Sequence, residues 1–136
     1  MSATVRVVPT GEQTVSRQGL NQFEGVSAQS VGSRGLCAHI LAIPPGARAK
    51  AHRHVGHETA IYVLEGNAVV WFGENLESRA EAAAGDFVYI PPGVPHVPIN
   101  VSDTEWARAV VARTDANEQE SVELLPHLDE LPHVTA

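Results

Sequence analysis

The sequence predicts an all-β domain, a sandwich or a barrel, and three observations lead to that prediction. Eleven glycines and nine prolines punctuate the 136 residues at short intervals, as turns between short strands require. Apolar runs of four to eight residues, rich in Val, Ile and Ala, lie between these turn residues. Three of the runs end in a specific turn: Pro44-Pro45-Gly46, Glu65-Gly66-Asn67 and Pro91-Pro92-Gly93. Many short strands joined by such turns are typical of a sandwich or barrel.

Nine segments have the length, the composition and the flanking turns of strands. In chain order, the predicted strands are Thr4–Val8, Ser27–Val31, Leu36–Ile43, Lys50–His54, Ala60–Leu64, Ala68–Phe72, Phe87–Ile90, Val97–Val101 and Trp106–Ala112. The Ala-rich segment Asn75–Ala84 fits a short helix or a loop leading into an edge strand, and both interpretations stay open. After Arg113 the chain turns polar, and Pro126 and Pro132 interrupt any longer helix. Residues 114–136 are therefore predicted to form a short tail packed on a single domain that spans residues 1–136.

Charge and composition argue against several classes of function. Nine Lys and Arg against sixteen Asp and Glu give a formal net charge of −7, and no basic run is present, so we expect no nucleic-acid partner. Uninterrupted apolar stretches such as Ala60–Leu64 are far shorter than the roughly 20 residues of a membrane span, so we expect no membrane partner. The N-terminus lacks the pattern of a signal peptide, and Cys37 is the single cysteine, which favours a cytoplasmic location.

Four of the seven histidines lie in two short windows, residues 51–58 and 91–100. In an extended strand, His52 and His54 project from the same face because they are two residues apart, which lets both imidazoles reach one metal ion. His96 follows a Pro-Pro-Gly turn in a separate predicted strand. These three histidines are the first candidates for metal ligands.

A further ligand is predicted from the residues that follow the first histidine pair. Gly56 permits a bend, and His57 and Glu58 come directly after it. Regular alternation counted back from Gly66 places His57 on the inward face, whereas a bulge near Thr59 would turn Glu58 inward instead. Both alternatives stay open. Three or four such ligands suit one divalent transition-metal ion per chain, Fe, Mn, Ni, Cu or Zn, with a coordination position left for substrate or water.

Two motifs in this region resemble those of the cupin superfamily. Residues 46–66, GARAKAHRHVGHETAIYVLEG, resemble the first cupin motif, and residues 85–100, GDFVYIPPGVPHVPIN, match the second without a departure. The first motif departs in one respect, because seven residues rather than six separate Glu58 from Gly66. Strict spacing from the glycine would put the family's glutamate ligand at Thr59. The acidic ligand is therefore expected at Glu58 with a bulge, or else His57 completes an all-histidine site.

The resemblance implies a double-stranded β-helix, the jelly-roll barrel of two antiparallel sheets, with the metal inside near one mouth. It also implies a homodimer, in which Thr4–Val8 is a candidate for a strand exchanged between subunits or for a plain edge strand. As in many small bacterial cupins, the site would belong to a metal-dependent enzyme, either dioxygenase-like or a decarboxylase, isomerase or cyclase. The alternative is a non-catalytic module that binds a metal or a small ligand.

Strand alternation adds three candidate pocket residues, each with a structural alternative. The predicted interior is apolar, so a mostly apolar or aromatic small molecule is the expected ligand or substrate. His39 would act as an acid or base, but a lone strand histidine is more often structural. Trp71 would face the pocket if its side of the strand points inward. Arg108 would bind a substrate carboxylate, although an arginine near Glu105 is more often part of a surface ion pair.

Overall fold

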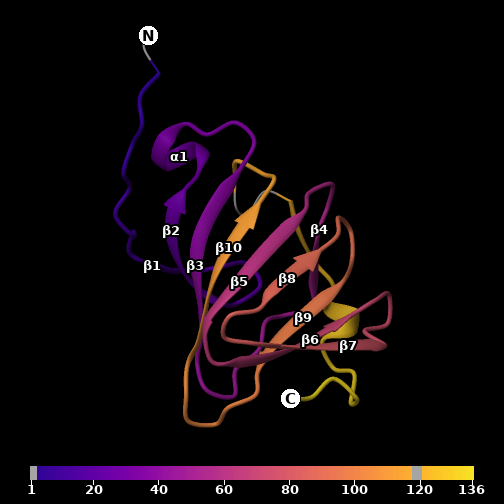
Figure 1. The fold of residues 1–136 in the computed structure, drawn as a ribbon. Coiled ribbons are helices and arrows are strands. Elements are labelled where there is room, and N and C mark those ends of the chain that lie inside the picture. The colour runs from indigo at the N-terminus through magenta and orange to yellow at the C-terminus, as the bar shows by residue number, and fades with distance from the viewer. Residues whose placement is uncertain (1–2, 118–120) are drawn as a thin grey trace.

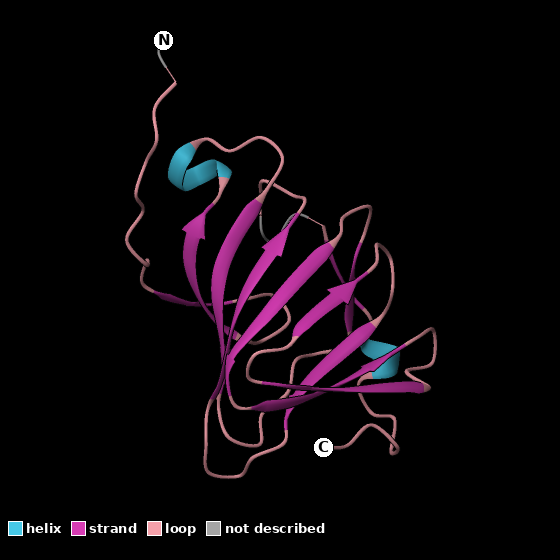
Figure 2. Cartoon of the chain, viewed as in Figure 1, coloured by secondary structure: helices cyan, strands magenta, loops and turns pink. Residues whose placement is uncertain are grey.

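The computed structural model of the chain describes residues 3–117 and 121–136. Two antiparallel sheets face each other and enclose the interior, as Figure 1 shows. Nearly all of the regular structure is strand, with two short helical segments in the described part of the chain (Figure 2). This architecture confirms the predicted all-β class and is consistent with a jelly-roll barrel.

The larger sheet has six strands in the order β1-β2-β3-β10-β5-β8. Its central strands, β3, β10 and β5, pair along most of their length, and β8 forms one edge. The bounds are β1 (Gln13–Val15), β2 (Asn21–Val26), β3 (Cys37–Ile43), β5 (Thr59–Glu65), β8 (Phe87–Ile90) and β10 (Ala107–Arg113).

The smaller sheet has five strands in the order β11-β4-β9-β6-β7. In this sheet β4 lies next to β9, with His52 paired opposite His96, so two segments far apart in the sequence meet at the histidines. The bounds are β4 (His52–His54), β6 (Asn67–Phe72), β7 (Ser78–Ala83), β9 (His96–Asn100) and β11 (Val122–Leu124).

The turns explain why these strands pair as they do. At the β5–β6 turn Gly66 has φ +87°, a left-handed conformation that favours glycine. A Cβ at this position would lie 2.8 Å from the Cα of Ala107, so the close approach of β10 also requires glycine here. Asn100 stabilises the C-terminal end of β9, since its side-chain amide donates to the carbonyls of Ile43, Pro44 and Glu105.

Two predicted strands are wrong. Thr4–Val8 has no regular structure, and Val5 and Val7 are 94% and 91% exposed, because none of the described strands pairs with them. Within Ser27–Val31 the chain forms the helical turn α1 (Ala28–Val31). There Ser27 and Ser30 cap each other's backbone N–H, so local side-chain hydrogen bonds replace a strand ladder.

Other differences are shifts and omissions. The segment Asn75–Ala84, for which both a short helix and a loop leading into an edge strand were considered, contains β7. The sequence does not predict β1, β2 and β11, because these strands are short, polar or interrupted by glycine. Strand β10 begins and ends one residue later than expected, which brings Arg113 into the strand. Strand β9 shifts the other way: it begins and ends one residue earlier than expected, so it includes His96.

The C-terminal segment packs on the smaller sheet. Leu125, Leu128 and Val134 join a buried cluster with Val97 and Ile99, which β9 presents on its outer side. The segment includes the 3₁₀ turn η1 (Pro126–Leu128), and Asp129 accepts a hydrogen bond from the backbone N–H of Ala51 at 2.7 Å. This contact fixes the residue next to His52. Among the described residues, no helix has the length and apolar character needed to cross a membrane.

Candidate metal centre

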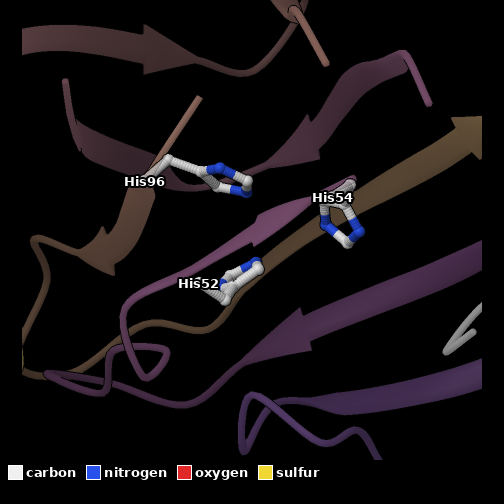
Figure 3. A group of neighbouring side chains, drawn as sticks. All are labelled: His52, His54 and His96. Atoms are coloured by element: carbon white, nitrogen blue, oxygen red, sulfur yellow. The ribbon is translucent and has the colours of Figure 1, made fainter. Parts of the chain in front are cut away.

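Three histidine side chains meet inside the barrel, and Figure 3 shows their rings turned toward a common space. His52 and His54 come from β4, and His96 comes from the neighbouring β9. One ring nitrogen from each lies within 4.8 Å of the other two. Neighbouring nitrogens of a tetrahedral site, each about 2.1 Å from the ion, stand about 3.4 Å apart, so small movements of the rings would bring all three onto one ion.

Backbone carbonyls orient two of these rings. The Nδ1 of His52 donates to the carbonyl of Lys50 at 2.7 Å, and the Nδ1 of His96 donates to the carbonyl of Val94 at 2.9 Å. Because a carbonyl can only accept, each ring carries its proton on Nδ1 and keeps a lone pair on Nε2. The buried Nδ1 of His54 has no hydrogen-bond partner. Oriented, unprotonated imidazole nitrogens and an orphaned buried nitrogen fit a transition-metal ion.

Burial keeps the histidines neutral. His52, His54 and His96 are 2%, 3% and 4% exposed. Loss of hydration lowers the pKa of His96 to about 4 and holds the pKa values of His52 and His54 well below the usual range. The nearby guanidinium of Arg113 lowers these pKa values further. Neutral imidazole is the form that binds metal, so ion uptake would not have to displace a proton at pH 7.

The lowered pKa values predict that the metal-free protein loses stability in acid. The pKa of His39, also lowered to about 4 by burial and Arg113, lies below its unfolded value of 6.5. Between these values the unfolded chain binds more protons than the folded one, so the free energy of unfolding falls as pH drops from about 6.5 to 4. Each such histidine contributes a slope of up to about 1.4 kcal/mol per pH unit.

Urea unfolding in the presence of EDTA at pH 7.5, 6.0 and 5.0 measures this slope. His39→Asn should reduce it, whereas the exposed His127 provides a matched control in His127→Asn. Equal slopes in the wild type and both variants would contradict the prediction.

The two candidates for a fourth ligand lie apart from the three-histidine group. Glu58 is exposed and accepts a hydrogen bond from the hydroxyl of Tyr89 at 2.7 Å. The Nδ1 of His57 lies 3.7 Å from a carboxylate oxygen of the buried Asp115. Strand β5 alternates regularly from Thr59 to Val63, so the bulge that would turn Glu58 inward is absent there. The register shift of β5 against β10 lies at its far end.

Thr59 occupies the inward position at the start of β5. Its side chain is buried, and its Oγ1 accepts a hydrogen bond from the Nε of Arg113 at 3.0 Å. Arg113 is the residue that sequence reasoning missed, because the predicted strand stopped at Ala112. The alternation of buried Ala107, Ala109 and Val111 in β10 already points to Arg113 as the next inward position.

The three candidate pocket residues have different surroundings. His39 is 5% exposed on β3, and its pKa responds to Arg113, so it lies inside the barrel near the histidines. The indole of Trp71 donates to the carbonyl of Thr135 at 2.7 Å, which places it on the outer side of β6 against the C-terminal segment. The side chain of Arg108 is 45% exposed and lies 3.7 Å from Glu65.

An apolar cavity of about 190 Å³ borders the histidine group. His96 forms part of its wall, together with side chains from β6, β7 and β8 and the loop before β9. The lining residues are Val70, Phe72, Ala80, Val88, Tyr89, Ile90, Pro91 and Val94. A cavity of this volume can hold a benzene-sized group. The arrangement therefore places a candidate ion site next to space for an apolar molecule.

Comparison with known sequences gives a family and two curated relatives. The profile of the cupin domain family matches residues 39–112, more than half of the chain. An uncharacterized protein of Methanocaldococcus jannaschii is 31% identical over 61 residues, covering 45% of this chain and 46% of that protein. Germin-like protein subfamily T member 3 of Arabidopsis thaliana is 33% identical over 84 residues, covering 60% of this chain and 37% of that protein. The chain thus spans less than half the length of either relative.

Solved structures share the fold at low sequence identity. Oxalate decarboxylase from Bacillus subtilis aligns with a TM-score of 0.74 and 21% identity, covering 92% of this chain and 33% of that one. The Streptomyces protein PAC13, solved with uridine, aligns with a TM-score of 0.68 and 14% identity, covering 92% of both chains. The fold, the two motifs and the family profile agree, and the chain belongs to the cupin domain family.

Proposed function

We propose that this cupin is a metal-dependent enzyme that acts on a small, mostly apolar or aromatic organic molecule. One observation carries the proposal: three buried, neutral histidine side chains converge beside an apolar cavity that His96 itself borders. Structural use of histidine would not require three desolvated rings in one place, because each neutral ring there loses hydration without gaining a charged partner.

In this proposal, metal binding and substrate binding belong to different groups of residues. His52, His54 and His96 would hold one divalent ion, with Fe, Mn, Ni, Cu and Zn as the candidates. Such an ion supplies Lewis acidity toward an oxygen of the substrate. Val70, Phe72 and the other cavity residues would bind the apolar part of the substrate and exclude water from the reacting groups. Within this proposal the reaction is dioxygenase-like, or a decarboxylation, isomerisation or cyclisation.

The experiment that tests the proposal combines metal loading with a substrate screen. The protein is stripped with chelator, reloaded separately with each of the five metals, and incubated under air and under nitrogen with a panel of aromatic and aliphatic oxo- and hydroxy-compounds. We expect product by mass spectrometry, or oxygen uptake, with at least one metal, lost on chelation and restored by that metal. Ligand binding without turnover under every condition would favour the alternative, a non-catalytic binding module.

The proposal extends to assembly and compartment. Support for a homodimer comes from the outer face of the β5–β8 edge, where Tyr62, Leu64, Phe87 and Tyr89 are 36%, 42%, 79% and 60% exposed. The rings of Tyr62 and Phe87 lie 4.8 Å apart, so this apolar surface is continuous across both strands. A cytoplasmic location is supported by Cys37, which is buried and is the one cysteine of the sequence, so it has no second cysteine here with which to form a disulfide.

A further inference from the structure

The C-terminal segment, residues 121–136, holds the backbone directly before His52. The N–H of Ala51 donates a hydrogen bond to a carboxylate oxygen of Asp129 at 2.7 Å, and the carbonyl of Ala51 accepts one from the N–H of Leu125 at 2.8 Å. Ala51 itself is fully buried. Strand β11, which belongs to the same segment, pairs with all three residues of β4. The peptide groups on both sides of Ala51 therefore take their orientation from the C-terminal segment.

One of these peptide groups also orients a candidate metal ligand. The N–H of Ala51 and the carbonyl of Lys50 belong to the same peptide group, which is planar and trans, so the two point in opposite directions. On the far side from Asp129, this carbonyl accepts the Nδ1 hydrogen bond of His52 at 2.7 Å. A chain of two hydrogen bonds thus connects the carboxylate of Asp129 to the ring of His52 through one rigid peptide group.

A carboxylate at the end of this chain acts on the ligand in two ways. It fixes the plane of the peptide group, and with it the direction of the Lys50 carbonyl that orients the His52 ring. Its negative charge is partly buried and polarises the peptide group, because hydrogen bonds in a chain strengthen one another. A stronger acceptor at Nδ1 makes Nε2 a better electron-pair donor to a cation. Carboxylates often support metal-bound histidines by a direct hydrogen bond, and here a peptide group lies between the two.

The hydrogen bond of His96 has no such extension. Its Nδ1 donates to the carbonyl of Val94 at 2.9 Å. The nitrogen of that peptide group belongs to Pro95 and carries no hydrogen, so it cannot donate to a carboxylate. An effect of Asp129 is therefore expected at His52 and not at His96, which serves as an internal reference.

We propose that Asp129 is a positioning residue of the metal centre, which raises the metal affinity by orienting and polarising His52 through the peptide group between Lys50 and Ala51. The inference goes beyond the proposed function, because it assigns a role in metal binding to a residue outside the three-histidine group. It rests on the proposed function for the metal ion.

The first test compares Zn²⁺ affinities by competition with a chromophoric chelator. Asp129→Ala removes the acceptor and should weaken binding by about tenfold to a hundredfold. Asp129→Asn keeps an oxygen acceptor without the charge and should weaken binding by only about threefold. Trp71→Phe is the matched control, because it removes another 2.7 Å hydrogen bond to the same segment, the one to the carbonyl of Thr135. Its Zn²⁺ affinity should stay within about twofold of the wild type.

NMR of the histidine ring nitrogens in the metal-free proteins at pH 7.5 separates positioning from a general loss of stability. In Asp129→Ala the Nδ1–H proton of His52 should move upfield, because its hydrogen bond to the Lys50 carbonyl weakens, and in Asp129→Asn it should move less. The Nδ1–H proton of His96 should keep its chemical shift in both variants. In Trp71→Phe neither proton should move.

Equal Zn²⁺ affinities in Asp129→Ala and Trp71→Phe, or a His52 resonance that does not respond to Asp129→Ala, would overturn the inference. Urea unfolding of the metal-free proteins shows whether each variant folds. If Asp129→Ala does not fold, Asp129→Asn decides the question by the same two measurements, and wild-type affinity with an unmoved His52 resonance counts against the inference. A wild type that takes up no Zn²⁺ contradicts the proposed function instead, while the metal-free resonances still decide whether Asp129 positions His52.

Discussion

Alanine in place of His96 is expected to abolish metal binding by this protein. His96 is the one member of the group that comes from β9, so its loss leaves two imidazoles on β4. Even residues that only support a ligand cost about tenfold to a hundredfold in metal affinity when changed, so removal of a direct ligand should cost more than about a hundredfold. Elemental analysis after dialysis should find about one first-row metal ion per wild-type chain and almost none in His96→Ala.

The control for this result is another buried histidine. His39→Asn alters a ring inside the barrel that is not part of the three-nitrogen group, and its metal content should match the wild type. Competition with a chromophoric chelator gives the affinities, and urea unfolding of the metal-free proteins shows whether each variant folds. Retention of the ion by His96→Ala, with loss in His39→Asn, would contradict the site described for His52, His54 and His96.

Glutamate in place of Thr59 is expected to tighten metal binding by about tenfold to a hundredfold. The new carboxylate would point inward from the position that strict spacing gives to an acidic ligand, where it adds an oxygen donor to the three nitrogens. It would also offset the positive charge of Arg113, the hydrogen-bond partner of Thr59. Both effects favour the bound cation.

Thr59→Gln separates charge from size in this experiment. Glutamine has nearly the shape of glutamate and no charge, so its metal affinity should stay close to that of the wild type. Chelator competition at one pH and ionic strength compares the three proteins. A glutamate variant that binds metal no more tightly than the glutamine variant would show that position 59 does not reach the ion.

Most of the barrel could be predicted from local sequence. Strands such as Phe87–Ile90 follow from an apolar run between glycine and proline, and the turn at Gly66 follows from its φ requirement. The failures occur where local hydrogen bonds or distant partners decide the conformation. The capping bonds of Ser27 and Ser30 form α1 in place of a strand, and Thr4–Val8 pairs with no strand in the described part of the chain.

The candidate site was predicted unevenly for the same reason. The two-residue spacing of His52 and His54 places both on one face of any strand, so that pair required no knowledge of the fold. The choice between His57 and Glu58 depended on whether β5 contains a bulge near Thr59. Its only register irregularity against β10 lies near Glu65, and this is decided by how the two strands pair.

Turns, alternation and motif spacing are local properties of the chain, and they suffice to predict the family, the all-β class and the candidate metal-binding histidines. The pairing of His96 opposite His52, the inward orientation of Thr59 and its contact with Arg113 become known only from the assembled fold. Those contacts depend on strand register and on which strands become neighbours. Neither is encoded in any single segment, because both result from the packing of the two sheets around one interior.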